Sequence, residues 1–207
     1  MQNQSQKFDT IIFDLGGVLI DWDPRYLYRS LFKTEDEVDW FLKNVCTPEW
    51  NEQQDAGRSF SIATEELVAR FPQHETAIRA WYDRWQETIR GPIHGTVNVL
   101  EALRNKKQHR LYALTNWSAE TFPWALENFH FLHWFEGIVV SGVEKTRKPF
   151  PDIFHILFDR YQVTPHRALF IDDNRANIET ARALGLDTIH FLSPGDLREQ
   201  LTNRSLL

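Results

Sequence analysis

Short apolar segments recur along the chain, and several of them end at a polar residue. The first, at residues 8–14 (FDTIIFD), is almost continuously apolar and closes on an acid. Continuous apolar character is typical of a strand that is buried on both faces of a parallel sheet. The same pattern returns in four later segments, at residues 109–115, 137–141, 168–172 and 187–192. The repetition predicts a five-stranded parallel sheet.

Helical patterns lie between most of these segments. They cover residues 96–107, 119–128, 151–162 and 175–184. Strands that alternate with helices are typical of an α/β fold in which a parallel sheet is covered by helices on both faces. We therefore expect a doubly wound, Rossmann-like sheet.

Residues 24–90 interrupt this alternation because they carry no convincing strand. The residues from Thr34 to Glu37 form a capping-box pattern that would open a helix. A further helix is expected over about 74–89. The sequence thus predicts an α/β core domain made of residues 1–23 and 92–207, with a helical cap domain at residues 24–91 inserted after the first strand.

The many aromatic residues have two expected locations. Trp81 and Trp85 are four residues apart, so one helix would present both on the same face. Together with Trp40 they are expected in the core of the cap. Trp22 and Trp117 adjoin the polar ends of strands, where they would either flank a substrate or pack in the wall of the pocket.

Charge and cysteine content restrict the partners and the compartment. The net charge of −6 disfavours binding to a nucleic-acid backbone. No segment has the roughly 18 consecutive apolar residues of a membrane span. The polar residues 1–7 do not resemble a secretory signal, and the single Cys46 fits a reducing compartment. We expect a cytoplasmic protein, a monomer or homodimer, that acts on a small molecule.

Polar residues stand at the carboxyl ends of the expected strands. Asp14 ends the first strand, Thr115 ends the second, and Asp172 ends the fourth. Three neighbours extend this set: Asn116, Asp173 and Lys148. Because ligands of an open parallel sheet bind beyond the carboxyl ends of its strands, these side chains are expected to converge.

The expected cluster fits phosphoryl chemistry. Grouped carboxylates repel one another unless a cation offsets their charge, and oxygen ligands suit Mg²⁺. An aspartate such as Asp14 can act as a covalent nucleophile. Lys148, Thr115 and the N–H groups of the turn at Leu15 and Gly16 can hold phosphate oxygens.

Four segments together resemble the motifs of the haloacid dehalogenase-like hydrolases. They are FDLGGV at 13–18, LTN at 114–116, RKP at 147–149 and FIDDNRANI at 170–178. They occur in the order typical of the family, and the helical insert lies where one subgroup carries its cap. The first and last motifs are also similar to a bacterial group that includes alpha-glucose-1-phosphate phosphatase. Residues 55–59 (DAGRS) are similar to the cap loop that reaches toward the substrate.

The resemblance implies a role for each matching residue. Asp14 would form a phosphoaspartyl intermediate, and Lys148 would bridge this nucleophile and the phosphate. Mg²⁺ would be held by Asp14, the Gly16 carbonyl and Asp172, with Asp173 close by or ligating. Thr115 and Asn116 would bind the phosphoryl group, as would the turn at Leu15 and Gly16.

One position departs from the family pattern. Most phosphatases of this family have a second aspartate two residues after the nucleophile, and here that residue is Gly16. Loss of a general acid costs about 10² to 10⁴ in rate. Either the substrate has a good leaving group, as sugar 1-phosphates have, or a cap residue or water supplies the proton. The candidate donors are Asp21, Glu49, Glu52 and Asp55.

Three other functions are compatible with parts of the pattern. A 2-haloacid dehalogenase would use the same aspartate to attack carbon, but it needs no metal and leaves the paired acids Asp172 and Asp173 unexplained. Signalling receiver domains have a similar set of residues in a different chain order. A catalytically weak phosphate-binding relative would explain Gly16. A Mg²⁺-dependent phosphatase acting on a small phosphomonoester fits the whole set.

Overall fold

The computed structural model describes residues 8–207, and a five-stranded parallel sheet lies at its centre. The strand order is β5-β4-β1-β6-β7. The strands are β1 (Thr10–Phe13), β4 (Arg110–Thr115), β5 (Gly137–Val140), β6 (Ala168–Asp172) and β7 (Asp187–His190). The prediction of a doubly wound parallel sheet is confirmed. The chain order reverses on either side of β1, so the binding edge of the sheet is expected at its carboxyl end.

Strand β1 is buried on both faces, which explains its continuous apolar sequence. Its successive side chains point to opposite faces of the sheet. Ile11 and Phe13 belong to one hydrophobic cluster, and Ile12 belongs to another.

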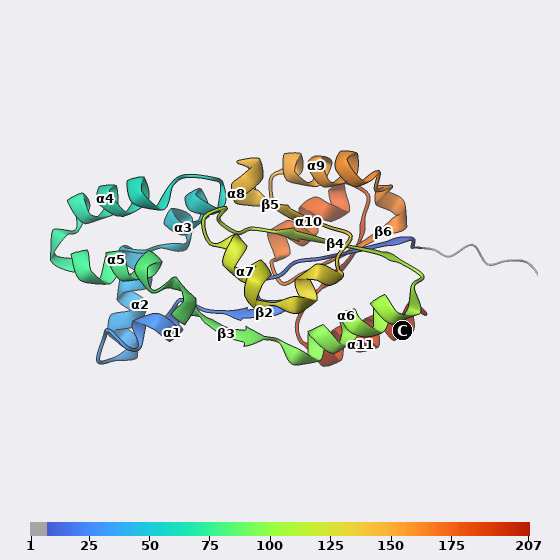
Figure 1. Cartoon of the computed structure of the whole chain (residues 1–207), viewed down its shortest axis with the longest axis horizontal. Coiled ribbons are helices and arrows are strands. Elements are labelled where there is room, and N and C mark those ends of the chain that lie inside the picture. Colours follow the sequence, from blue (N-terminus) through green and yellow to red (C-terminus); the bar gives the residue numbers. More distant parts are fainter. Residues whose placement is uncertain (1–7) are drawn as a thin grey trace, which may run out of the picture.

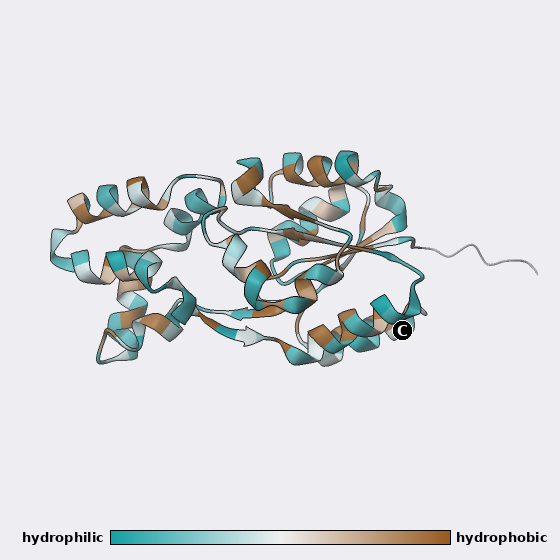
Figure 2. Ribbon diagram, in the orientation of Figure 1, coloured by the Kyte–Doolittle hydropathy of each residue, from teal (hydrophilic) through white to brown (hydrophobic). Residues whose placement is uncertain are grey.

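Helices cover both faces of the sheet (Figure 1). One face is packed by α6 (His94–Lys106), α7 (Phe122–Asn128) and α11 (Pro194–Asn203). The other face is packed by α9 (Pro151–Tyr161) and α10 (Arg175–Ala183). Three short elements complete this unit: α8 (Ser141–Glu144), η3 (His130–Trp134) and η4 (Pro165–Arg167). Figure 2 shows that the central strands are largely hydrophobic, whereas the helices alternate between hydrophobic and polar residues.

The segment between the first strand and α6 forms a second, helical unit with its own hydrophobic cluster. Its α-helices are α1 (Arg25–Tyr28), α2 (Glu35–Asn44), α3 (Pro48–Asp55), α4 (Phe60–Arg70) and α5 (Glu75–Asp83). Two 3-10 turns, η1 (Pro72–His74) and η2 (Trp85–Thr88), follow α4 and α5. Thr34 and Glu37 form the expected capping box at the start of α2. In Figure 1 this unit extends from one end of the sheet.

Two short antiparallel strands connect the helical unit to the sheet, and the sequence did not predict them. They are β2 (Ile20–Trp22) and β3 (Ile89–Pro92), and Asp21 pairs with Gly91. Neither strand is long enough for an alternating pattern, and Gly91 and Pro92 are residues that normally argue against a strand.

Three expectations about aromatic residues were partly wrong. The helix expected over 74–89 ends at Asp83, and η2 follows it, so Trp81 and Trp85 do not share a helix. Trp81 does lie in the core of the helical unit. Trp85 instead packs edge-on against Trp124 of α7, at a centroid distance of 4.9 Å. Trp40 is 49% exposed on the outer surface of α2.

Residues 1–7, on which the expectation about a secretory signal rests, lie outside the described residues. From residue 8 onward, none of the helices combines the length and apolar character of a membrane span.

Candidate active site

Three aspartates meet at the carboxyl end of the sheet. Asp14 directly follows β1, Asp172 ends β6, and Asp173 follows it. Because β1 and β6 are parallel neighbours, their ends bring these side chains together. One carboxylate oxygen from each residue lies within 4.8 Å of the others. The predicted convergence of Asp14, Asp172 and Asp173 is therefore seen in the structure.

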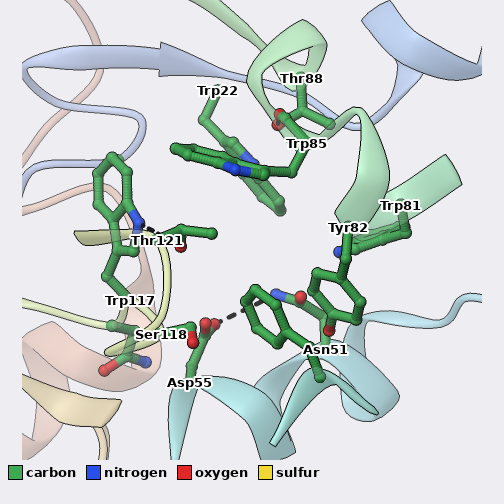
Figure 3. Close-up of a pocket in the computed structure, with 13 residues that line it drawn as sticks. Trp22, Asn51, Asp55, Trp81, Tyr82, Trp85, Thr88, Trp117, Ser118 and Thr121 are labelled. Carbon is green, nitrogen blue, oxygen red and sulfur yellow. Dashed lines mark hydrogen bonds between the residues drawn. The ribbon is translucent and has the colours of Figure 1, made fainter. Parts of the chain in front are cut away.

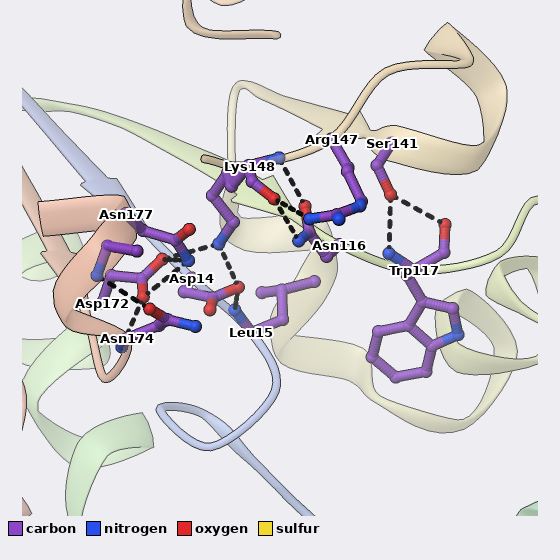
Figure 4. Close-up of polar contacts among 11 residues, drawn as sticks. Asp14, Leu15, Asn116, Trp117, Ser141, Arg147, Lys148, Asp172, Asn174 and Asn177 are labelled. Carbon is purple, nitrogen blue, oxygen red and sulfur yellow. Dashed lines mark hydrogen bonds and ion pairs between the residues drawn. The ribbon is translucent and has the colours of Figure 1, made fainter. Parts of the chain in front are cut away.

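A buried lysine links two of these aspartates (Figure 4). Lys148 Nζ lies 2.8 Å from Asp14 Oδ1 and 2.7 Å from Asp172 Oδ2. The Lys148 side chain is only 1% exposed. A buried ammonium ion is stable only when it is paired, so the two carboxylates compensate for its loss of hydration.

Two asparagines that the sequence analysis gave no role hold Asp172 in place. Asn177 Nδ2 donates to both Asp172 oxygens at 3.0 Å, and the Asn174 backbone N–H donates to Oδ1 at 2.8 Å. Asn174 is also the N-cap of α10. Both residues lie in the segment 170–178, but the sequence of this segment does not indicate which of its polar side chains contact Asp172.

The charges in this cluster change one another's protonation. Burial raises the pKa of Asp14 well above its usual value, and Asp172 and Asp173 raise it further, although Lys148 opposes them. Burial and the charge of Asp172 also raise the pKa of Asp173. Burial favours neutral Lys148, but the charges of Asp14 and Asp172 outweigh it and raise the lysine pKa. The cluster thus has an excess of negative charge.

The residues expected to bind phosphate occupy different environments. Thr115 is fully buried, and its Oγ1 has no hydrogen-bond partner among residues 8–207. Asn116 instead exchanges two 2.9 Å hydrogen bonds with the backbone of Lys148. Its side-chain amide therefore fixes the position of the loop that carries Arg147 and Lys148, which we call the lysine loop. The Leu15 N–H donates to Asp14 Oδ1 at 2.7 Å.

The turn after β1 contains Gly16 and Gly17, and its conformation requires glycine only at residue 17. Gly17 has a φ of +72°, and a Cβ there would lie 2.4 Å from Asp173 Oδ2. A Cβ at Gly16 would meet nothing within 4 Å. Gly17 therefore permits the close approach of Asp173, and Gly16 faces open space.

The donor set fits a hard divalent cation. Asp14, Asp172 and Asp173 offer carboxylate oxygens within 4.8 Å of one another, and Lys148 balances only part of their charge. Oxygen-only donors of this kind suit Mg²⁺, which retains several water ligands and accepts phosphate oxygens.

A pocket that opens onto Gly16 and Asn116 lies between the helical unit and the sheet. Its walls are largely aromatic, and Figure 3 shows Trp22, Trp85 and Trp117 around the same space as Tyr82. Trp22 and Trp117 both line this pocket, as their places next to the strand ends led us to expect. The polar lining residues, in addition to Asn116, are Asn51, Asp55, Thr88, Ser118 and Thr121.

Only one of the four candidate proton donors lines this pocket. That residue is Asp55. Asp21 accepts a 2.8 Å hydrogen bond from the Tyr26 hydroxyl, and Glu52 pairs with Arg147 at 2.6 Å. Glu49 is exposed at the start of α3.

Polar contacts join the helical unit to the sheet unit around the pocket. Arg147 precedes Lys148, and its ion pair with Glu52 ties the lysine loop to α3. The Phe60 N–H donates to Glu120 Oε1 at 2.8 Å. Arg58, in the loop expected to reach the substrate, pairs instead with Glu66 and Gln53 of its own unit.

Comparisons with known proteins agree with this geometry. The chain is 23% identical to the D-ribitol-5-phosphate phosphatase of Bacteroides thetaiotaomicron, over 93% of this chain and 96% of that protein. It is 22% identical to the phosphorylated carbohydrates phosphatase of Thermotoga maritima, over 88% and 84% of the two chains.

A solved structure and a family model also match. The structure is a haloacid dehalogenase family enzyme from Bacteroides thetaiotaomicron in complex with magnesium and inorganic phosphate. It superposes with a TM-score of 0.66 at 21% identity, and the match covers 90% of this chain and 95% of that one. The family model for haloacid dehalogenase-like hydrolases matches residues 8–185. With its fold, its ordered motifs and this match, the chain belongs to the haloacid dehalogenase-like hydrolases.

Proposed function

We propose that the protein is a Mg²⁺-dependent phosphatase that hydrolyses a small phosphomonoester through a phosphoaspartyl intermediate on Asp14. The observation that carries this proposal is the buried position of Lys148 Nζ, within 2.8 Å of Asp14 and 2.7 Å of Asp172. This arrangement keeps one Asp14 oxygen oriented, while the other remains for attack on phosphorus.

The surrounding residues would hold the substrate and the cation. Asp14, the Gly16 carbonyl and Asp172 would hold Mg²⁺, with Asp173 beside them. The cation would offset the negative charge of the carboxylates and the phosphate. The unpartnered Thr115 hydroxyl would donate to a phosphoryl oxygen, and Lys148 would hold a second one. Asn116 supports this step indirectly, because it fixes the Lys148 backbone.

The helical unit would act as a cap. We assign residues 24–91 to this cap domain, and residues 1–23 and 92–207 to the core domain. The helical unit has its own hydrophobic cluster, and it is joined to the sheet unit by the paired strands β2 and β3. Both features support this division. Closure over the pocket would exclude bulk water while the phosphoryl group is transferred.

The lining of the pocket favours a polyol or sugar phosphate. Aromatic side chains such as Trp22, Trp117 and Tyr82 offer flat apolar faces for the C–H groups of a sugar. Asn51, Ser118 and other polar lining residues can form hydrogen bonds with its hydroxyls. The names of the two similar phosphatases, which act on ribitol 5-phosphate and on phosphorylated carbohydrates, agree with this class.

Phosphate release from a panel of sugar, nucleotide, acyl and 4-nitrophenyl phosphates, with and without Mg²⁺, tests the proposal. We expect Mg²⁺-dependent release that falls by several orders of magnitude in Asp14→Asn, because the amide is a poor nucleophile. Asp14→Asn should remain folded by circular dichroism.

Two other results would overturn the proposal. Release of chloride from 2-chloropropionate without phosphate release would identify a dehalogenase. Mg²⁺ and phosphate binding without turnover on any substrate would identify a catalytically inactive relative.

A further inference from the structure

The proposed reaction needs a proton donor for the leaving-group oxygen, and residue 16 supplies none. A Cβ at Gly16 would meet nothing within 4 Å, and Gly16 lines the pocket. The space that an acidic side chain at this position would fill is therefore open and continuous with the pocket. A donor must reach this space from another element.

Asp55 is the acidic side chain that lines the pocket. Tyr82 is the other lining residue with a titratable group, and burial raises its pKa far above the ordinary phenol value. A phenol that holds its proton so tightly is a weak general acid at neutral pH. Asp55 is thus the lining group best suited to proton transfer.

The position of Asp55 leaves one oxygen available. Asp55 is the last residue of α3, and Asn51 lies one turn before it. Asn51 Nδ2 donates to Asp55 Oδ2 at 3.2 Å, which orients the carboxyl group (Figure 3). Within residues 8–207, Asp55 Oδ1 makes no hydrogen bond. An oriented carboxyl group with one free oxygen is suited to hydrogen-bond a bound substrate.

The surroundings of Asp55 allow it both to release and to accept a proton. Burial, together with the nearby charge of Glu52, raises the pKa of Asp55 to about 7, although the charge of Arg147 opposes this rise. Tyr82, which also lines the pocket, stays neutral near pH 7 because burial raises its pKa. Lys145 lies next to Gly57, two residues beyond Asp55. A carboxyl group with a pKa near the working pH is populated in both forms, as acid–base catalysis requires.

Contacts between cap and core hold Asp55 at the pocket that opens onto Gly16 and Asn116. Glu52 lies three residues before Asp55 on α3 and pairs with Arg147, the neighbour of Lys148. Phe60, which also lines the pocket, is tied to Glu120 of the core. Closure of the cap would therefore bring Asp55 and the catalytic lysine into one enclosed site.

We propose that Asp55 of the cap is the general acid and base of this phosphatase, in place of the acid that is absent at Gly16. This inference rests on the proposed function.

Two balanced steps follow from this assignment. In the first, an Asp14 oxygen bonds to phosphorus, the bond to the leaving oxygen breaks, and that oxygen takes the Asp55 proton. In the second, water attacks the phosphoaspartate and gives a proton to Asp55, and the bond between phosphorus and Asp14 breaks. Inorganic phosphate leaves, and both side chains return to their starting forms.

Asp55→Asn tests the assignment through its dependence on the leaving group. For the alkyl phosphate that wild type hydrolyses fastest, we expect kcat/KM to fall about 10² to 10⁴-fold, because an alkoxide needs a proton to leave. For 4-nitrophenyl phosphate, kcat/KM should change little, because nitrophenolate leaves without one. Its kcat should still fall, with a burst of nitrophenolate, because water attack has lost its base.

Two further variants make the test specific. Glu49→Gln removes the same charge from an exposed position of the same helix, and it should keep the wild-type rates on both substrates. Asp55→Asn/Gly16→Asp places a carboxyl group in the open space at residue 16, and it should regain part of the lost kcat/KM on the alkyl phosphate. A purely structural role for Asp55 predicts no such rescue.

Failure of this inference is distinguishable from failure of the proposed function. The inference is overturned if Asp55→Asn lowers kcat/KM equally on both substrates or on neither. It is also overturned if wild type hydrolyses only aryl and acyl phosphates. The proposed function itself fails if wild type releases no phosphate from any substrate, or if phosphate release does not depend on Asp14.

Discussion

At the scale of single residues, Lys148 shows how the site depends on compensation of charge. Its ammonium group is buried between Asp14 and Asp172, and neither carboxylate would be stable in that position without a cation. The lysine is thus both a structural counter-ion and a group that would meet phosphate. Three carboxylates and one ammonium leave net negative charge, which a divalent cation would balance.

Asp55 should make the free energy of unfolding depend on pH. Its pKa is raised from 3.8 to about 7, so the folded chain keeps a proton that the unfolded chain releases. The stability that this proton provides is fully present below about pH 4 and is lost as the pH rises through 7. Asp55→Asn lacks this loss, so at pH 8 it should be more stable than wild type by roughly 1 to 3 kcal/mol.

Denaturant unfolding of both proteins across the pH range measures this effect. The difference between them should shrink toward zero near pH 4. A constant difference from pH 4 to pH 8 would show that the Asp55 carboxyl group titrates normally in the folded chain.

Single residues also show what the sequence could and could not predict about the site. The convergence of Asp14 and Asp172 could be predicted because Asp14 follows β1 and Asp172 ends β6, and the sheet brings these strand ends together. Lys148 was expected just after the third strand of the sheet, and it reaches the two aspartates from the loop that follows α8. Asn177 was not assigned a role, because its contact with Asp172 depends on the packing of α10. Asp55 could only be one of four candidates, because the position of the cap over the core is a tertiary property.

At the scale of elements, the turn after β1 should tolerate a methyl group at one glycine and not at the next. In Gly17→Ala, the new Cβ would lie 2.4 Å from Asp173 Oδ2 and the backbone would keep a φ of +72°. We expect a loss of roughly 1 to 3 kcal/mol in stability and weaker Mg²⁺ binding. Gly16→Ala is the matched control, because its Cβ would meet nothing within 4 Å.

Thermal unfolding and Mg²⁺ titration of the two variants compare these positions. Equal stability and equal Mg²⁺ affinity of the two variants would contradict the close approach of Gly17 to Asp173.

The elements were predicted unevenly, for physical reasons. The five strands of the sheet were found because burial on both faces gives them continuous apolar sequence. Strands β2 and β3 were missed because they are short and contain Gly91 and Pro92. The helix expected over 74–89 was too long. The four-residue spacing of Trp81 and Trp85 suggested one continuous helix, but it is equally compatible with α5 followed by the turn η2.

At the scale of the whole molecule, Mg²⁺ should stabilise the folded chain. The proposed ligands, Asp14, Gly16, Asp172 and Asp173, come together only in the folded state, so Mg²⁺ at 100 times its Kd should add about 2.7 kcal/mol. This corresponds to a rise of several degrees in Tm. Thermal unfolding with Mg²⁺ and with EDTA measures the shift.

Asp172→Asn is the control for this shift. It should lose most of the rise in Tm that Mg²⁺ produces. An undiminished rise would place the cation elsewhere in the molecule.

The pairing of β2 with β3 means that the chain enters and leaves the cap at neighbouring points. Asp21 and Gly91 face each other, although 69 residues separate them in the sequence. Evolution can therefore exchange everything between them without altering the order of strands in the core. In this protein such an exchange would replace the proposed proton donor, Asp55, together with the cap side of the pocket. A cap with a new substrate specificity would then also have to supply an acidic group.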